Sequence, residues 1–375
     1  MKNILFFIRS LNVGGAERQL VVTAKGLAER GHNVTVLTFY NSGFYADELT
    51  NINVQLLSLN KQGRWDLFAF FYRLFKALRQ QNPDVIYSYM NTANILVMML
   101  RPFICPARIV WGVRASNMDL KQYDWLSRWS YWLECRLSRF ADVIIANSHA
   151  GLEYAVEHGF PGQKITVIPN GIDTKRFYPD KSAGDSLRQC WGVAENERLI
   201  GAVGRIDPMK GIPVFLAAAA KIKQQHAHAR FVWVGVGEAN YEKKMYELAT
   251  QLNLDDALIW AGRHTDMLAV YNAFDIASSS SYGEGFPNVL GEAMACGVPC
   301  VVTDVGDSAL VVGETGKAVP AKDSNALSSA WDEMLLLDDE EIKPLSVSAR
   351  KRVVNEFSVK ALLNDTEDVI SQGTS

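Results

Sequence analysis

Several features are scarce in these 375 residues, and each absence excludes a class of protein. The net charge is only −3, from 38 basic and 41 acidic residues, so the chain has no general basic field with which to neutralise nucleic-acid phosphates. The five cysteines form no C-x-x-C pair, and this pattern predicts reduced thiols in a cytoplasmic protein.

Long apolar runs are also missing. The longest uninterrupted run near the middle, residues 95–100, is bounded by Asn94 and Arg101 and is far shorter than the roughly 20 residues of a bilayer-spanning helix. The opening MKNILFFI leads directly to Arg9 and a glycine loop, which favours a buried strand over a signal peptide. We therefore expect a soluble chain without a membrane span.

The length of the chain favours two domains, because 375 residues are more than a domain with a single hydrophobic core usually contains. In the first half, short apolar runs alternate with glycine turns and stretches of helical composition, which predicts a parallel, doubly wound α/β sheet. The apolar runs cover residues 4–8, 34–39, 54–59, 85–89, 108–113, 143–147 and 165–168.

A second alternation of the same kind begins near residue 199, after a polar stretch, 173–185, that we interpret as a linker. The expected strands are 199–203, 230–234, 258–261, 276–279 and 299–303. The expected helices are 212–225, 242–252, 265–274, 325–337 and 346–370. The sequence thus predicts two similar Rossmann-like sheet domains that face each other across a cleft.

The segment EGFPNVLGE, residues 284–292, sets Glu284 and Glu292 eight positions apart around a turn that opens a helix. Asn288 is its expected N-cap and Gly297 its expected end. Free N–H groups at such a helix start attract anions, for example a diphosphate. Glu292 can accept hydrogen bonds from two neighbouring hydroxyls, as a ribose offers, which suits a sugar nucleotide. The alternative is that the position near a helix start merely favours carboxylates.

Two cations are expected at the same edge of the second sheet. The segment GRIDPMKG begins at Gly204, follows a strand, precedes a helix and carries Arg205 and Lys210. Arginine binds phosphate oxygens in pairs and lysine acts as a mobile point charge, so the two can neutralise a departing diphosphate. The alternative is that both only solvate a loop.

The chain contains no Asp-x-Asp, the pair with which a magnesium-dependent transferase holds its metal on a diphosphate. We therefore expect neither a metal nor another cofactor. Gly14 and Gly15 follow the first strand without the G-x-G-x-x-G spacing, which disfavours a nicotinamide enzyme. The pair permits close backbone approach to a ligand, and a tight turn without a ligand is the alternative.

Taken in order, these segments resemble family 4 of the retaining glycosyltransferases, which have the GT-B fold. The resemblance covers residues 4 to about 316 and is carried by Gly14-Gly15-Ala16-Glu17-Arg18, Asn147-Ser148, Pro169-Asn170-Gly171-Ile172-Asp173, Gly204-Arg205, Lys210-Gly211, Val234-Gly235-x-Gly237-Glu238, Glu284-Gly285-Phe286-Pro287-Asn288 and Glu292. It implies an acceptor-binding N-terminal domain, 1–172, and a nucleotide-sugar-binding C-terminal domain, 185–350. It also implies a final helix, about 351–375, that returns to the first domain.

The same resemblance implies roles for single residues. Arg205 and Lys210, beside Gly204, would bind the donor diphosphate. Glu292 would bind the ribose hydroxyls, and Glu284 would bind the transferred sugar. Backbone amides facing sugar and phosphate would come from the residues after Gly285, namely Phe286, Pro287 and Asn288. From the opposite domain, the diphosphate would be approached by Gly15, next to Gly14.

One departure from the family pattern concerns the first domain. Many relatives carry a histidine near the end of a strand that faces the cleft, where this chain reads WGVRASN, residues 111–117. Arg114 would take the sugar-facing place, and because it stays protonated it can only orient or stabilise charge. An ordinary salt bridge is the alternative. The histidines show no ligand spacing, and His149 is expected in a loop or at a helix start.

Aromatic and cationic residues mix in two segments of the first domain, as they do in interfacial helices. They are residues 64–76, beginning with Arg64, and then Trp125, Arg128, Trp129, Tyr131, Trp132 and Arg136. One interpretation is that the aromatic faces pack on their own sheet. The other is a peripheral enzyme at the cytoplasmic face of the inner membrane.

The resemblance and the residues together predict a cytoplasmic, retaining glycosyltransferase of surface polysaccharide or lipopolysaccharide biosynthesis. It would move a hexose or N-acetylhexosamine from a nucleotide sugar, with a UDP-sugar favoured, to a glycan or polyprenyl-diphosphate-linked acceptor. No separate protein base is evident, which fits a front-face mechanism in which the leaving phosphate accepts the acceptor's proton. Two alternatives are a non-catalytic sugar-nucleotide-binding relative and a nucleotide-sugar epimerase of similar architecture.

Overall fold

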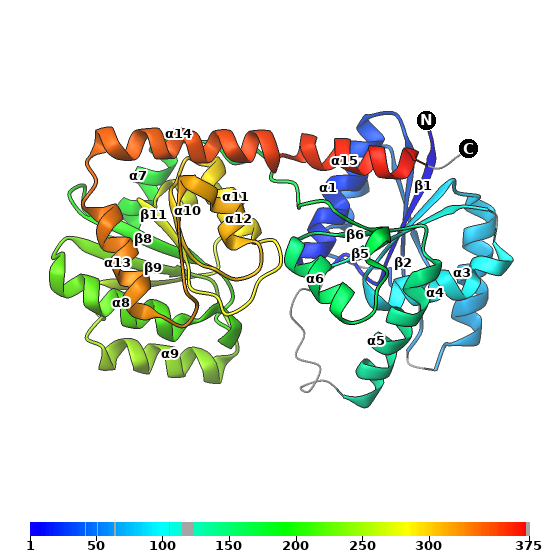
Figure 1. Ribbon diagram of the computed structural model, residues 1–375, viewed down its shortest axis with the longest axis horizontal. Coiled ribbons are helices and arrows are strands. Elements are labelled where there is room, and N and C mark those ends of the chain that lie inside the picture. The colour runs from blue at the N-terminus through cyan, green and yellow to red at the C-terminus, as the bar shows by residue number, and fades with distance from the viewer. Residues whose placement is uncertain (42, 51, 64, 105, 115–123, 373–375) are drawn as a thin grey trace. The chain divides into compact units, whose positions relative to one another are not determined.

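The computed structural model describes residues 1–41, 43–50, 52–63, 65–104, 106–114 and 124–372. It divides the chain into two compact units, each with its own parallel sheet (Figure 1). The first unit comprises Met1–Gly171 together with Val359–Ser375, and the second comprises Ile172–Ser358. No helix within these described ranges is both long and apolar enough to cross a bilayer.

The sheet of the first unit has seven strands in the order β3-β2-β1-β4-β5-β6-β7, and every pairing is parallel. Its strands are β1 (Asn3–Ile8), β2 (Asn33–Thr38), β3 (Val54–Ser58), β4 (Val85–Tyr89), β5 (Arg108–Val113), β6 (Val143–Ala146) and β7 (Ile165–Val167). The helices are α1 (Gly15–Glu29), α2 (Ala46–Thr50), α3 (Phe68–Gln81), α4 (Met90–Leu100), α5 (Trp125–Leu137), α6 (His149–Glu157) and α15 (Val359–Ser371).

The sheet of the second unit has six parallel strands in the order β10-β9-β8-β11-β12-β13. Its strands are β8 (Arg198–Val203), β9 (Ala229–Val234), β10 (Leu258–Gly262), β11 (Ile276–Ser279), β12 (Cys300–Thr303) and β13 (Lys317–Val319). The helices are α7 (Lys181–Cys190), α8 (Ile212–Gln225), α9 (Ala239–Gln251), α10 (Met267–Asn272), α11 (Asn288–Ala295), α12 (Ser308–Val312), α13 (Ser324–Leu335) and α14 (Asp339–Glu356).

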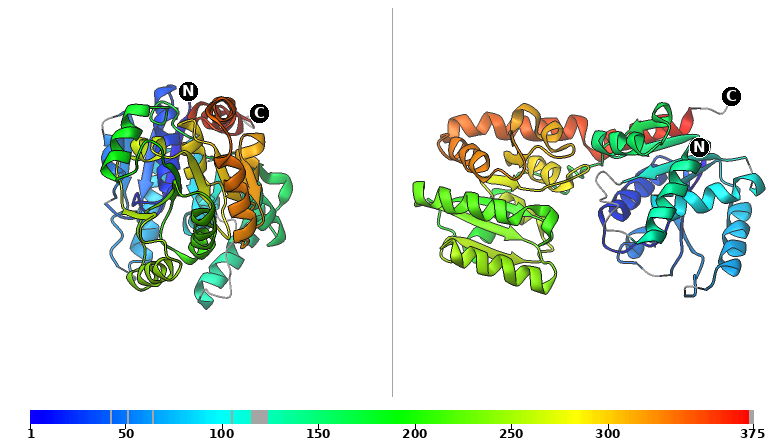
Figure 2. Two further views of the ribbon diagram at one scale, coloured as in Figure 1. Left: turned by 90° about the vertical axis from the view of Figure 1, so that its left-hand side faces the viewer. Right: turned by 60° about the horizontal axis from the view of Figure 1, so that its bottom comes forward.

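The central strands, such as β4, β11 and β12, are buried on both faces because helices cover both sides of each sheet (Figure 2). Along β1, Phe6 packs in one hydrophobic cluster with α1 and α15, and the next residue, Phe7, packs in another with α3 and α4. Successive side chains of a strand point to opposite faces, so a strand between two helical layers needs apolar residues at nearly every position. The predicted doubly wound parallel sheets are confirmed.

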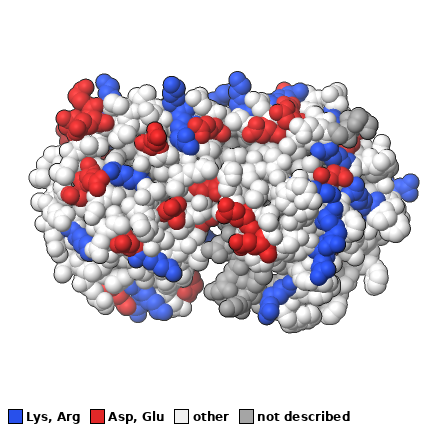
Figure 3. Space-filling model, in the orientation of Figure 1, with Lys and Arg blue, Asp and Glu red and all other residues white. Residues whose placement is uncertain are grey.

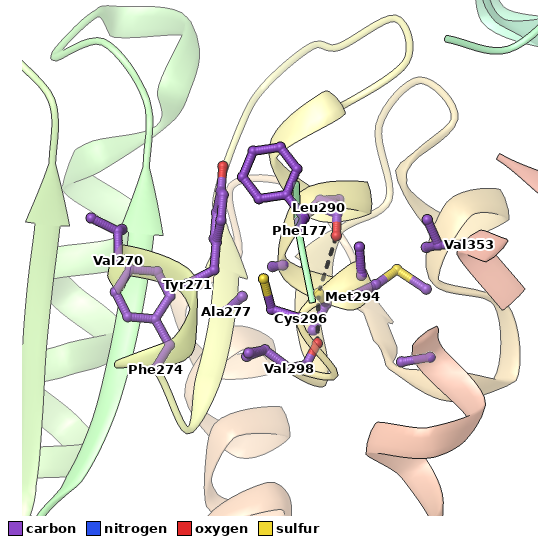
Figure 4. Close-up of a cluster of buried hydrophobic side chains, with 14 of the residues drawn as sticks. Phe177, Val270, Tyr271, Phe274, Ala277, Leu290, Met294, Cys296, Val298 and Val353 are labelled. Carbon is purple, nitrogen blue, oxygen red and sulfur yellow. Dashed lines mark hydrogen bonds between the residues drawn. The ribbon is translucent and has the colours of Figure 1, made fainter. Parts of the chain in front are cut away.

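The stretch 173–185 was expected to be a linker, and this expectation is wrong. Phe177 is fully buried in a core of the second unit, where its ring lies 5.7 Å from that of Tyr271 (Figure 4). The residues around Phe177 are polar because they face solvent on the way into α7, so the composition of the segment did not indicate a buried ring. Asp180 caps that helix by accepting a hydrogen bond from the Ala183 N–H at 3.1 Å.

The single helix expected over 346–370 is two helices, α14 and α15, which are separated at Phe357 and Ser358. α15 belongs to the first unit and packs against α1. A side chain at Gly26 of α1 would overlap Leu363 of α15, with its Cβ only 2.3 Å from a Leu363 methyl carbon. The Lys2 side chain donates to the Ile370 carbonyl at 2.8 Å and holds the end of the helix.

Candidate active site

The strand order of the second sheet reverses between β8 and β11. These two strands are neighbours, but the chain continues from β8 toward one edge of the sheet and from β11 toward the other. Ligands of open parallel sheets bind beyond the carboxyl ends of the strands at such a switch point. The loops after β8 and β11 meet there, and Lys210 Nζ from the first donates to Glu284 Oε1 from the second at 2.5 Å. Two residues 74 positions apart are thus joined because their strands are neighbours.

Serines at the end of β11 fix both members of this pair. The Ser280 hydroxyl donates to the Lys210 carbonyl at 2.9 Å, and the Ser281 hydroxyl donates to Glu284 Oε1 at 2.6 Å. Gly211 has a φ of +61° and lies so close to this segment that a Cβ would be 1.9 Å from the Ser280 carbonyl oxygen. The two loops are therefore packed backbone to backbone. We did not predict the serines, although a run of four, 278–281, directly before the carboxylate was a visible signal.

The loop after β12 packs against the backbone of Glu284 and Gly285. Gly306 has a φ of +55°, and a Cβ there would lie 2.1 Å from the Glu284 carbonyl oxygen. The Asp307 N–H donates to the Gly285 carbonyl at 3.1 Å. Gly306 was also missed, because a single glycine after a strand is an ordinary turn signal.

Helix α11 begins one residue earlier than predicted. Asn288 is its first helical residue, and the N-cap is Pro287, which makes no side-chain capping bond. The expected Asn288 cap is therefore wrong, because the fixed φ of proline already turns the chain into the helix. Pro287 also has no N–H and cannot present an amide, and its carbonyl accepts from the Leu290 N–H at 3.0 Å. Gly297 follows the helix end with a φ of +78°, as predicted.

Glu292 lies on the inner side of α11 and is only 4% exposed. The Tyr271 hydroxyl donates to Glu292 Oε2 at 2.6 Å, and Tyr271 itself belongs to the core beside Phe177 (Figure 4). A buried carboxylate needs hydrogen bonds to offset its desolvation, and this tyrosine supplies one of them. Sequence reasoning identified the carboxylate but missed Tyr271.

Arg205 is not brought to the Lys210 and Glu284 pair. Its side chain is 80% exposed, and Nη2 lies 3.8 Å from Asp207 Oδ2. It borders a pocket of about 540 Å³ whose other charged lining residues are Asp207, Glu238 and Lys244. Arg205 thus lies at the edge of the site with its side chain largely in solvent.

Gly204 precedes Arg205 and lies against the aliphatic part of the Lys210 side chain, which a Cβ at Gly204 would approach to 3.4 Å. Its carbonyl accepts a hydrogen bond from Trp233 Nε1 at 3.1 Å. Across the described ranges, no group of three or more histidines, cysteines or acidic residues could hold a metal ion. Lys210, Arg205 and Lys244 supply positive charge at this edge.

In the first unit, Arg114 follows β5, and its recorded partners among the described residues are neutral. Its Nη1 donates to Asn170 Oδ1 at 2.7 Å and its Nη2 donates to the Tyr89 hydroxyl at 3.1 Å. The guanidinium also lies 4.9 Å from the centre of the Tyr89 ring. No carboxylate partner of Arg114 is recorded among the described residues, and its sugar-facing role stays a prediction. The neighbouring Ser116 and Asn117 lie outside the described residues.

Gly14 is the N-cap of α1 in an extended conformation, and Gly15 is the first helical residue. One turn further, the buried Gln19 side chain exchanges two hydrogen bonds with the backbone of Gly171, at 3.0 and 3.1 Å. The start of α1 is therefore fixed to the segment that follows β7. His149 is the first residue of α6, as expected.

Helix α5 combines an inner and an outer face. Tyr131, Glu134 and Cys135 are buried, whereas Trp125 is 76% exposed and Trp129 and Trp132 are about half exposed. Packing on the first unit is confirmed for the inner face of α5, and membrane contact of the exposed tryptophans stays a prediction. The exposed face borders a pocket of about 780 Å³ whose cationic lining residues are Arg128, Arg136 and Arg139. Basic side chains predominate on this side of the first unit (Figure 3).

On the second aromatic segment, α3, Phe70 is buried while Phe68 and Tyr72 are exposed. Arg64 at its start lies outside the described residues.

Two units, each built on a parallel α/β sheet, are the architecture of the GT-B glycosyltransferases. The model for "Glycosyltransferase Family 4" matches residues 13–176, and that for "Glycosyl transferases group 1" matches residues 197–336. The chain belongs to glycosyltransferase family 4, a retaining family whose members use nucleotide sugars.

Two enzymes and one solved structure illustrate the relationship. The chain is 27% identical over 305 residues to the Escherichia coli UDP-Gal:α-D-GlcNAc-diphosphoundecaprenol α-1,3-galactosyltransferase, covering 79% of this chain and 77% of that one. It is 26% identical to the Campylobacter jejuni GalNAc-α-(1→4)-GalNAc-α-(1→3)-diNAcBac-PP-undecaprenol α-1,4-N-acetyl-D-galactosaminyltransferase, covering 99% of both. The fold matches Anabaena Alr3699/HepE in complex with UDP with a TM-score of 0.86, 24% identity and full coverage of both chains.

Proposed function

We propose that this chain transfers a hexose or N-acetylhexosamine from a UDP-sugar to a lipid-linked glycan acceptor in surface polysaccharide biosynthesis. The observation that carries the proposal is the pair of Lys210 and Glu284 at the switch point, beside the helix α11 that bears the buried Glu292. Relatives support the finer assignment: the Escherichia coli enzyme is named for UDP-Gal and a diphosphoundecaprenol acceptor, and the Campylobacter enzyme for an undecaprenol-linked glycan.

The donor would extend along the loop and helix that join Glu284 to Glu292. Glu292, held by Tyr271, accepts the ribose hydroxyls. The positive end of the α11 dipole and the ammonium of Lys210 stabilise the diphosphate. Glu284 accepts hydroxyls of the transferred sugar with the carboxylate oxygen that Lys210 and Ser281 leave open. Arg205, whose side chain is 80% exposed, reaches the diphosphate from the rim of the site.

Sugar transfer develops positive charge on the sugar ring and negative charge on the leaving diphosphate. Lys210 stabilises the second and Glu284 the first, so both lower the barrier by electrostatic complementarity to the transition state. The bond from the anomeric carbon to the diphosphate oxygen breaks, and the acceptor oxygen bonds to that carbon on the same face. The leaving phosphate oxygen accepts the acceptor's proton, which requires neither a separate protein base nor a metal ion.

The acceptor's lipid favours a second proposal, that the exposed face of α5 contacts the cytoplasmic surface of the inner membrane. Trp125, Trp129 and Trp132 supply amphipathic rings, and neighbouring arginines supply charge for anionic headgroups. Flotation with vesicles containing anionic lipid tests it. The double variant Trp125→Ser and Trp129→Ser should lose binding, and the control Leu336→Ser, on an exposed residue of the second unit, should keep it. A parent protein that stays with the soluble fraction at low salt contradicts the proposal.

Thermal unfolding with a panel of UDP- and GDP-sugars tests the donor assignment, because a ligand that binds only the folded state raises the melting temperature. We expect UDP-sugars to stabilise the protein and GDP-sugars not to. Mass spectrometry of reactions with the stabilising sugar then separates the alternatives. Transfer or slow donor hydrolysis supports the enzyme, unchanged donor indicates a binding protein, and an isomeric nucleotide sugar formed without acceptor indicates an epimerase.

A further inference from the structure

Glu284 receives two donors on one of its two carboxylate oxygens. Lys210 Nζ and the Ser281 hydroxyl both donate to Oε1, at 2.5 and 2.6 Å. Within the described part of the chain no donor is recorded for Oε2, and the Glu284 side chain is 14% exposed. The two oxygens of Glu284 therefore have different roles. Oε1 is held by the protein, and Oε2 can accept a hydrogen bond from a ligand hydroxyl.

Ser281 is itself held in place. It is only 1% exposed, and its carbonyl accepts a hydrogen bond from the Thr303 hydroxyl at 2.7 Å. The Ser279 hydroxyl donates to the Ser281 hydroxyl oxygen at 3.3 Å. A hydroxyl has one hydrogen, and with its oxygen already accepting from Ser279, the Ser281 hydrogen is directed to Glu284. The strand end thus delivers a single, fixed donor to the carboxylate.

We propose that Ser281 is a positioning residue that orients Glu284 for the transferred sugar. This inference rests on the proposed role of Glu284. Lys210 alone does not fix the carboxylate, since an ammonium on a flexible stem is a point charge with three rotatable donors, whereas the serine is short and buried. With Ser281 in place, Lys210 can turn toward the leaving diphosphate while Glu284 keeps its orientation. Preorganised groups of this kind act without reorganising at the moment of reaction.

The test is a double-mutant cycle on Ser281 and Glu284, measured as kcat and donor KM. Ser281→Ala should lower kcat about tenfold, as expected for loss of one charge-assisted hydrogen bond, with donor KM changed less than about twofold. Ser281→Cys keeps the side-chain volume but donates weakly, and should show the same loss. In a Glu284→Gln background, Ser281→Ala should cause no further loss of kcat, because its effect passes through the carboxylate.

Ser328→Ala is the matched control, since it removes a buried serine whose hydroxyl donates to the Asn325 carbonyl on α13. It should leave both kinetic constants unchanged. An equal loss of kcat from Ser281→Ala in both backgrounds overturns the inference, because the serine then supports the loop without acting on Glu284. A Glu284→Gln variant as active as the parent is a different outcome, which removes the proposed role of Glu284 and the positioning role with it.

Discussion

Substitutions of Glu292 and of its partner Tyr271 can separate an effect on donor binding from an effect on folding. We expect Glu292→Ala to weaken UDP binding, because the charged carboxylate would lose its hydrogen bonds to the ribose hydroxyls. A hydrogen bond to a charged group contributes about 1.5 to 3 kcal/mol, so losing one bond should raise the Kd about 10-fold to 150-fold. Isothermal titration calorimetry with UDP measures this directly.

The same substitution also affects folding, and a control must separate the two effects. Removing the carboxylate leaves the Tyr271 hydroxyl, on a residue 1% exposed, without the partner it has at 2.6 Å. Loss of a buried hydrogen bond to a charged group costs about 1.5 to 3 kcal/mol of folding free energy. Tyr271→Phe removes the same hydrogen bond and keeps the carboxylate, so we expect it to lower the free energy of unfolding and to change the Kd for UDP less than about threefold.

Two results would refute this reasoning. Glu292→Ala with the parent's Kd for UDP would show that the carboxylate does not contact the nucleotide. Tyr271→Phe with a loss of affinity as large as that of Glu292→Ala would show that affinity follows the integrity of the core below α11.

Three further predictions follow from the same geometry. Lys210→Ala should lower kcat about 100-fold and donor affinity far less, as expected for a group that stabilises charge in the transition state, and steady-state kinetics showing full turnover would contradict this role. Gly306→Ala should lower both the melting temperature and kcat, since a Cβ would lie 2.1 Å from the Glu284 carbonyl oxygen, and a variant equal to the parent in both measurements would refute the contact. Burial raises the pKa of Cys296 and Cys300 to about 12, so iodoacetamide at pH 7.5 should label the exposed Cys190 and spare these two, as peptide mass spectrometry can check.

The fold was predictable because strand and helix signals repeat at nearly regular intervals. Strands buried on both faces, such as β4 (Val85–Tyr89), are short apolar runs that composition alone identifies. Composition gave a wrong prediction for the segment around Phe177, where one buried ring lies among polar residues that face solvent. A single core residue gives no periodicity, so this segment was assigned to a linker.

The candidate site was predictable where motifs carry their chemistry in the side chain, as Glu284, Glu292 and Lys210 do. The supporting residues were not predictable, because their role depends on contacts between distant segments. Ser281 and Tyr271 became functional candidates only when the structure placed them within 2.6 Å of a carboxylate oxygen. Arg114 shows the same limit, since its neutral partners come from distant segments: Tyr89 from the end of β4 and Asn170 from the segment after β7.

One measurement tests the central claim most directly. The purified protein is incubated with a UDP-sugar that stabilises it and a synthetic polyprenyl-diphosphate-linked N-acetylglucosamine, and the product is analysed by mass spectrometry and NMR. We expect release of UDP and one added sugar in α-linkage, from an α-configured donor, with both lost in Glu284→Gln. A β-linked product, or transfer undiminished by that substitution, would contradict this expectation.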